Sequence, residues 1–211
     1  MPQSAHPDSH FTRKMPKKQG KVTLKKLWTA VQNTRLATLS PEEIREHLLH
    51  HAFLWIENTE SDRFQSPDDA LPEELGKRLR GFLFPESPTP LRKQLEQLAL
   101  LSEAFHPSPK AHGVFYTPPD LVQWIVDRCF EYVSPSEFIR FCVYDPACGS
   151  GLFLWAAYEK LKALHPNANE AQCRYWQEHL LGTDIDHSAL EVARFGLRQL
   201  WRRDYPLTPL P

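Results

Sequence analysis

The feature that most constrains the fold is an apolar segment that runs into a glycine-rich turn, because this order predicts a buried strand followed closely by a helix. Residues 138–144 (FIRFCVY) are mostly apolar, aromatic or β-branched, and helical periodicity begins soon after, at 152–164. A second strand is predicted at 180–185 and a long helix at 188–201. Alternating strands and helices predict an α/β layer fold for this part of the chain.

The first half of the chain has a different pattern. Residues 1–26 hold seven basic residues and one acid, which predicts a disordered arm that is either simply solvated or in contact with phosphates. Residues 27–109 are helical in pattern, and Ser40-Pro41-Glu42-Glu43 is typical of a helix start. Prolines near 107–109 mark the boundary. We therefore expect a basic arm (1–26), a helical region (27–109) and an α/β region (110–211).

Composition limits the class of protein. The 211 residues carry a formal net charge of -1, which argues against a globally basic nucleic-acid binder but allows a local basic patch. The four cysteines form no CxxC pair, and Cys129 and Cys142 are expected to be buried free thiols. His47 and His51 have a metal-like spacing, but no third ligand accompanies them, so no metal is expected. No apolar run approaches the roughly 18 residues of a membrane span and no secretory signal is evident, so we expect a soluble, cytoplasmic protein.

Three stretches carry the candidate chemistry. The first, DPACGSG at 145–151, places glycines and free helix N–H groups where a ligand can approach the backbone, and its spacing disfavours dinucleotide, P-loop and nucleophile-elbow sites. The second, GTDID at 182–186, ends a strand with an acid that can accept two hydrogen bonds from a vicinal diol. In the third, GVFYTPPD at 113–120, Thr117 and Asp120 predict a helix cap. Taken singly, each stretch is also explained by a bare turn or a helix cap; Asp186 or Ser188, for example, would cap the helix that follows.

Together and in this order, the three stretches resemble the adenine-specific DNA methyltransferases of bacterial restriction–modification systems, which use S-adenosylmethionine. That family has a G-x-F-Y-T-P segment, a D-P-A-C-G-S-G cofactor loop, and a G-x-D-I-D strand end before a helix rich in A-L-x-x-A-R; the last of these reads GTDIDHSALEVARFGL here. The resemblance covers roughly residues 110–201. It implies part of a Rossmann-like methyltransferase domain, preceded by a helical region.

The resemblance also implies roles for individual residues. Tyr116 and Thr117 would line the methionine end of S-adenosylmethionine, and Asp145 would meet its ammonium group. Asp184 would accept hydrogen bonds from the ribose hydroxyls, while Ile185 would pack on the adenine. The complete expected cofactor-binding set is Phe115, Tyr116, Thr117, Pro118, Asp145, Pro146, Ala147, Cys148, Gly149, Ser150, Gly151, Asp184, Ile185 and Asp186.

The family's catalytic N-P-P-Y or D-P-P-Y segment does not occur in this sequence, in which Pro118-Pro119 follows a threonine. In the family this segment accepts hydrogen bonds from the target amine and stacks the flipped adenine. No catalytic residue is therefore predicted, and two strands alone would leave apolar sheet edges unpaired.

These features predict a fragment or split subunit of a DNA adenine N6-methyltransferase. A second polypeptide or a C-terminal half would complete it, and the completed enzyme would act on DNA. One alternative is a non-catalytic cofactor-binding or scaffold module. Another is a methyltransferase that acts on a protein glutamine or an RNA amine.

Overall fold

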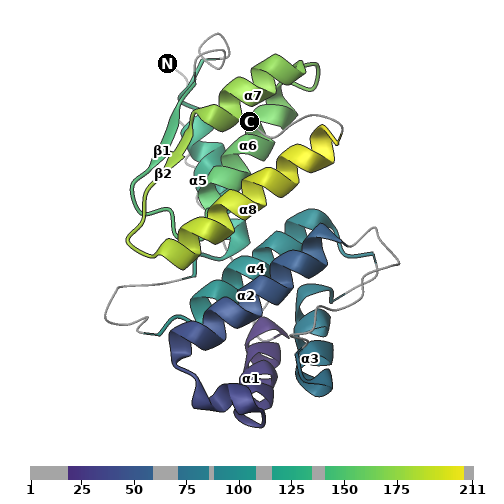
Figure 1. The fold of residues 1–211 in the computed structure, drawn as a ribbon. Coiled ribbons are helices and arrows are strands. Elements are labelled where there is room, and N and C mark those ends of the chain that lie inside the picture. Colours follow the sequence, from purple (N-terminus) through teal and green to yellow (C-terminus); the bar gives the residue numbers. More distant parts are fainter. Residues whose placement is uncertain (1–18, 59–70, 86–87, 108–115, 135–140, 207–211) are drawn as a thin grey trace, which may run out of the picture.

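The computed structural model describes residues 19–58, 71–85, 88–107, 116–134 and 141–206. Within these ranges the protein is mostly helical, with a small parallel sheet of two strands. The elements in chain order are α1 (Gln19–Gln32), the 3-10 helix η1 (Arg35–Thr38), α2 (Pro41–Glu57), α3 (Glu73–Leu83), α4 (Leu91–Ala104), α5 (Pro119–Phe130), β1 (Val143–Asp145), α6 (Leu152–Leu164), α7 (Glu170–Glu178), β2 (Leu180–Gly182) and α8 (His187–Asp204). In Figure 1 the elements α1–α4 form the lower half and the strands with α5–α8 form the upper half.

The helices of the lower half follow the predicted pattern, with one difference. The predicted start of α2 is confirmed: the Ser40 hydroxyl accepts a hydrogen bond from the Glu43 amide (3.3 Å), and the Glu43 carboxylate accepts one from the Ser40 amide (2.8 Å). The difference is at α1, which begins at Gln19, inside the segment expected to be disordered. Leu27 and Val31, one turn apart and fully buried, anchor this helix to the core.

The two strands are parallel and short. Val143 pairs with Leu180, Tyr144 with Leu181 and Asp145 with Gly182, and α6 packs against both strands. β2 ends at Gly182, sooner than predicted, because the chain turns away from the sheet there, whereas β1 continues one residue past its predicted end, to Asp145, before the glycine-rich turn. The predicted residues 138–140 lie outside the described residues.

One face of the sheet is open. The paired residues Tyr144 and Leu181 are 59% and 48% exposed, although both are large and apolar. The expectation that Cys129 and Cys142 are buried is wrong, because both thiols are exposed. Cys142 immediately precedes β1, and Cys129 lies outside the buried face of α5, which consists of Val122, Val126 and Phe130. The buried thiols are those of Cys148 and Cys173.

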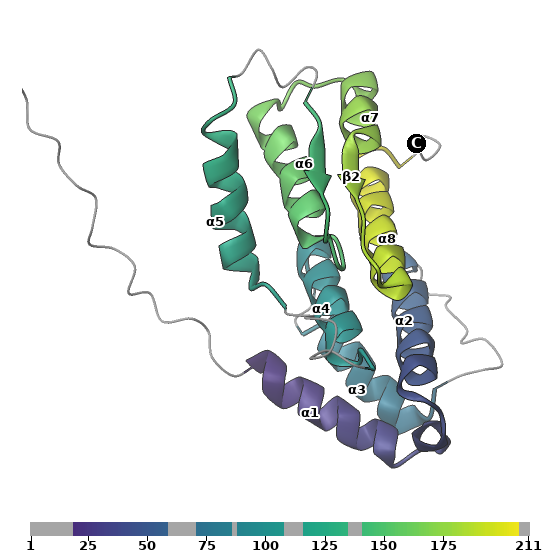
Figure 2. The same ribbon diagram turned by 90° about the vertical axis from the view of Figure 1, so that its left-hand side faces the viewer.

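The two halves share a single hydrophobic core. Helices α2 and α4 pack against α8, as Figures 1 and 2 show from two sides. The rings of Phe53 on α2 and Phe195 on α8 stack with centroids 4.4 Å apart. Arg92 on α4 forms an ion pair with Glu159 on α6. The helical region is therefore part of the same packed unit as the sheet. No helix in the described part of the chain is long and apolar enough to cross a membrane.

Helices α6 and α8 approach each other closely around one tryptophan. The Trp155 side chain is fully buried, and its indole N–H donates to the Ala193 carbonyl oxygen (3.0 Å). Gly196 faces the same ring: a Cβ at this position would lie 2.2 Å from two atoms of the Trp155 ring. The absence of a side chain at Gly196 is therefore what allows the two helices to pack at this distance.

Candidate functional site

A cavity of about 670 Å³ lies where the turns that follow β1 and β2 meet the helical region. From the α/β region it is lined by Tyr116, Thr117, Pro146, Ala147, Cys148, Gly149, Ser150, Leu152, Phe153, Asp184, Ile185, Asp186, His187, Ser188 and Ala189. From the helical region it is lined by Glu42, Arg45, Glu46, Ala99, Ser102, Glu103, His106 and Pro107. The carboxyl ends of parallel strands are the usual place for ligands in open α/β sheets.

The turn after β1 is held in shape by hydrogen bonds. The Ala147 amide donates to the Asp145 carboxylate (3.1 Å), and the Cys148 amide donates to the Thr183 carbonyl oxygen (3.0 Å). The Gly149 amide then donates to the Asp184 carboxylate (2.8 Å). These bonds fix the turn against the chain that follows β2, so the shape of the cavity wall is set before any ligand arrives.

Gly149 and Gly151 serve different purposes in this turn. Gly151 has a φ of 85°, and a Cβ there would lie 2.7 Å from the Ala193 Cβ, so this glycine allows α6 to pack on α8. Gly149 has a φ of 51°, and no atom lies within 4 Å of the place where its Cβ would be. Since Gly149 lines the cavity, its backbone is open to close approach by a ligand.

Helix α6 begins beside this open backbone. No side chain caps its N-terminus, and Leu152 and Phe153 in its first turn line the cavity. The first N–H groups of a helix favour a carboxylate or another polar acceptor. The donor set therefore fits an amino-acid moiety of the kind that S-adenosylmethionine carries.

Asp184 links the two turns. One carboxylate oxygen accepts from the Gly149 amide (2.8 Å) and the other accepts from the Asp186 amide (2.9 Å). Each carboxylate oxygen can accept a second hydrogen bond, so Asp184 remains able to receive hydroxyl groups from a diol. Ile185 beside it is 85% exposed and lines the cavity, so its side chain offers an apolar surface on which an aromatic ring can pack.

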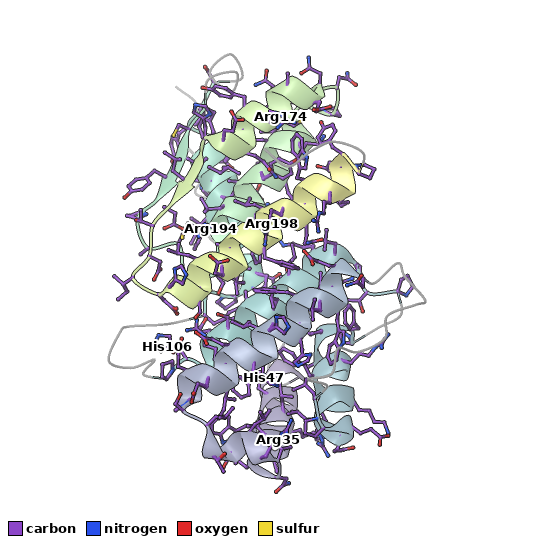
Figure 3. All side chains as sticks on the ribbon, viewed as in Figure 1. Arg35, His47, His106, Arg174, Arg194 and Arg198 are labelled. Atoms are coloured by element: carbon purple, nitrogen blue, oxygen red, sulfur yellow. The ribbon has the colours of Figure 1, made fainter. Side chains whose placement is uncertain are left out.

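Asp186 forms an ion pair with a residue of the helical region. Its carboxylate accepts two hydrogen bonds from the buried Arg45 guanidinium (2.6 and 3.0 Å), which also donates to the Ser102 hydroxyl (2.9 Å). His106 Nε2 lies 3.6 Å from the same carboxylate, and Figure 3 shows this histidine at the junction of the two halves. Asp186 also caps α8 by accepting from the Ala189 amide (3.2 Å), as predicted. Burial acts to raise the pKa of Asp186, but the Arg45 hydrogen bonds and charge outweigh it and lower that pKa.

The predicted cap at Thr117 and Asp120 is wrong. Helix α5 begins at Pro119, its cap residue is Pro118, and no side chain caps it. A residue that precedes a proline is kept out of the helical conformation, so Pro118 stays extended, with a ψ of 139°, and the helix starts one residue later. Thr117 lines the cavity instead, beside the partly buried Tyr116.

The cavity brings together most of the predicted set. Ten of the predicted residues line it, namely Tyr116, Thr117, Pro146, Ala147, Cys148, Gly149, Ser150, Asp184, Ile185 and Asp186. Pro118, Asp145 and Gly151 do not line it, and Phe115 lies outside the described residues. Burial, followed by the charges of Asp145 and Asp184, raises the pKa of the Cys148 thiol to about 11, so this thiol is protonated at neutral pH.

Sequence reasoning missed the wall that α2 and α4 provide. Arg45 is 1% exposed, yet it follows Ile44 in an ordinary amphipathic helix, and nothing nearby in the sequence distinguishes it from a surface arginine. No group of three potential metal ligands occurs among the described residues. The His47 and His51 rings contact each other edge to face, with centroids 4.9 Å apart.

Comparison with known proteins agrees with this geometry. The family model for N-6 DNA methylase matches residues 99–198. Residues 99–198, just under half of the chain, are therefore similar to the N-6 DNA methylase family. We call this stretch the methylase segment; it begins within α4 and ends within α8, so the cavity residues Ser102, Glu103 and His106 fall inside it. No curated protein and no solved structure matches the chain.

Proposed function

We propose that the cavity binds S-adenosylmethionine, and that the methylase segment is the cofactor-binding part of a Rossmann-like, site-specific DNA adenine N6-methyltransferase of a restriction–modification or phage-defence system. One observation carries this proposal. At the carboxyl ends of two adjacent parallel strands, the open backbone of Gly149 is hydrogen-bonded to the Asp184 carboxylate, and both residues line the same cavity. A glycine turn paired with an acid at the next strand end suits a nucleoside with an amino-acid tail.

Each part of the cavity has a task in this proposal. Asp184 accepts the ribose hydroxyls, and the exposed Ile185 covers one face of the adenine. The first turn of α6 meets the methionine carboxylate, while Tyr116 and Thr117 enclose the methionine chain. When bound, S-adenosylmethionine supplies a methyl group that its sulfonium makes electrophilic. The described residues thus bind and orient the donor, and no residue among them is assigned to the target amine.

Isothermal titration of the chain with S-adenosylmethionine tests the binding site directly. Replacing Ile185 with serine is expected to weaken binding about tenfold or more, since burying an isoleucine side chain is worth roughly 1.5–3 kcal/mol. The change should leave thermal stability unaltered, because the side chain is 85% exposed.

Tyr132→Ser is the matched control. Tyr132 is 81% exposed and lies outside the cavity lining, so its loss should change neither affinity nor stability. The proposed site would be contradicted if the unaltered chain did not bind S-adenosylmethionine, or if Ile185→Ser and Tyr132→Ser changed the affinity equally.

We further propose that the open face of the sheet is covered by a polypeptide segment that carries the remaining strands and an N-P-P-Y element, either in the same polypeptide or in a second one. Tyr144 and Leu181 support this, because they are large, apolar, adjacent in register and half exposed. Exposed sheet edges and faces of this kind favour association. DNA would then be bound by the completed enzyme.

Leu181→Glu is designed to disrupt association with the complementing segment without affecting cofactor binding. The variant should bind S-adenosylmethionine as the unaltered chain does, because Leu181 does not line the cavity. It should show less self-association in analytical ultracentrifugation, and methyl transfer to adenine-containing DNA on addition of a complementing segment should be lost. A chain that stays monomeric, with a complemented activity that Leu181→Glu leaves intact, would count against this use of the face. Binding of S-adenosylmethionine without any complemented methyl transfer would favour a non-catalytic cofactor-binding module.

A further inference from the structure

The C-terminal turns of α4 present one face to the cavity. Ala99, Ser102, Glu103 and His106 line it at the spacing of one helical face, although His106 lies just beyond the helix end. Ser102 is bonded to Arg45, and His106 lies beside Asp186. Glu103 is therefore the carboxylate that this face turns toward the ligand space.

Glu103 is held beside the segment that encloses the methionine end. Its carboxylate accepts a hydrogen bond from the backbone amide of Tyr116, and Tyr116 and Thr117 line the same cavity. An amide donor of this kind orients the carboxylate but leaves further acceptor positions on its oxygens. The group is thus placed at one end of the cavity, with capacity to bind a cation.

The charge balance of the cavity favours a positive ligand. Its described lining includes five acids and one arginine, and Arg45 is paired with Asp186. Glu42 accepts from the Ser188 hydroxyl (3.2 Å), and Asp184, which accepts from two backbone amides, is assigned above to the ribose hydroxyls. S-adenosylmethionine carries a sulfonium and an ammonium against one carboxylate, whereas its product S-adenosylhomocysteine has lost the sulfonium charge.

We propose that Glu103 supplies the carboxylate that recognises the positive charge of the methyl donor, so that the cavity prefers S-adenosylmethionine to S-adenosylhomocysteine. This inference rests on the proposed function and adds a specificity-determining residue from α4. The preference for S-adenosylmethionine also accounts for product release, because methyl transfer removes the positive charge that Glu103 binds.

The ionisation of Glu103 makes the proposal measurable near neutral pH. Burial raises the pKa of Glu103 to about 7, although the Tyr116 amide acts to lower it. A cation bound beside it lowers that pKa again, so binding releases a proton when the free chain is below about pH 7. Besides Glu103, the charged or titratable groups that line the cavity are Glu42, Arg45 and Glu46 on α2, His106 after α4, and Asp184, Asp186 and His187 on the chain from β2 into α8. Arg92 and Glu96 on α4 lie outside the lining but act electrostatically on Tyr116.

Titrations of both ligands with Glu103→Gln form the first test. The variant is expected to bind S-adenosylmethionine about tenfold more weakly, the effect of losing one hydrogen bond to a charged group, while its affinity for S-adenosylhomocysteine changes less than about twofold. Glu46→Gln removes the same charge from another part of the wall and should have a smaller effect. Glu191→Gln, outside the cavity on α8, should have none.

The pH dependence forms the second test. Between pH 6 and 7.5 the affinity of the unaltered chain for S-adenosylmethionine should rise by up to about tenfold, because the binding form is the ionised carboxylate. Glu103→Gln should flatten this rise. Deprotonation of His106 would act in the same direction, so a rise that persists in Glu103→Gln and disappears in His106→Gln would assign the effect to the histidine and overturn the proposal.

The outcomes distinguish this inference from the proposed function. If the unaltered chain binds neither ligand, both fail. If it binds both ligands and Glu103→Gln weakens them equally, the cofactor site stands and the charge-recognition role of Glu103 is wrong. If Glu46→Gln weakens the binding of S-adenosylmethionine as much as Glu103→Gln does, the preference comes from the summed negative charge of the acids in the cavity. The assignment to Glu103 is then also wrong.

Discussion

Replacing Gly196 with alanine is expected to lower the free energy of unfolding by about 3 kcal/mol or more, at the upper end of the usual cost of overpacking a core. The new methyl group would lie 2.2 Å from two Trp155 ring atoms and 2.5 Å from its Nε1 atom. The ring cannot move away easily, because it is fully buried and held by its bond to the Ala193 carbonyl oxygen. Denaturant unfolding followed by tryptophan fluorescence measures the change.

Gly81→Ala is the matched control for this prediction. Gly81 also lies within a helix, α3, but no atom lies within 4 Å of the place where its Cβ would be. Alanine should there stabilise the protein by about 0.5 kcal/mol, since it is the better helix former. Similar stabilisation by both substitutions would show that α6 and α8 are not packed as closely as described.

Removing the Arg45 guanidinium should cost nearly as much. Arg45→Met keeps the aliphatic stem but leaves the Asp186 carboxylate, 13% exposed, without its charge partner. Breaking a buried ion pair from one side typically costs 3–5 kcal/mol, and we expect about 3 kcal/mol because water partly reaches Asp186. Arg78→Met breaks the exposed pair with Glu74 on α3 and should cost less than about 0.5 kcal/mol.

The double variant Arg45→Met/Asp186→Asn isolates the pair. Asparagine keeps the cap on α8, so the double variant should be less destabilised than the sum of the two single variants. Because the folded pKa of Asp186 is lowered, the pair contributes fully above the ordinary value of 3.8, and its contribution is lost as the pH falls through the folded pKa. The gap between the unaltered chain and Arg45→Met should therefore narrow in acid. Additive effects that are independent of pH would argue against the pair.

The sequence correctly predicted those helix starts, ranges and caps that are determined by residues close together in the chain. The start of α2, the range 152–164 of α6 and the cap at Asp186 were all predicted, because each depends on residues within one or two turns. The cap at Thr117 was predicted wrongly because the rule for residues before proline outweighs a favourable spacing. The exposure of Cys142 was missed since burial of a strand depends on elements elsewhere in the chain.

The candidate site was predicted only on its α/β side. The motifs place Gly149 and Asp184 at strand ends, and the geometry of parallel strands brings them together. The opposite wall depends on contacts between residues far apart in sequence, such as Arg45 and Asp186, which are 141 positions apart. A single sequence contains no periodicity or spacing that reports such a pair.

The hydrogen-bonded connection from Arg45 through Asp186 and Asp184 to Gly149 also shows that a border of sequence similarity need not be a border of folding. Similarity to the methylases begins at residue 99, in the middle of α4, a helix that packs against α2 and α3 earlier in the chain as well as against α8. A protein trimmed to that border would lose the guanidinium that neutralises Asp186 and would expose the apolar side of α8. The smallest unit that can hold the glycine turn in place therefore reaches back at least to α2.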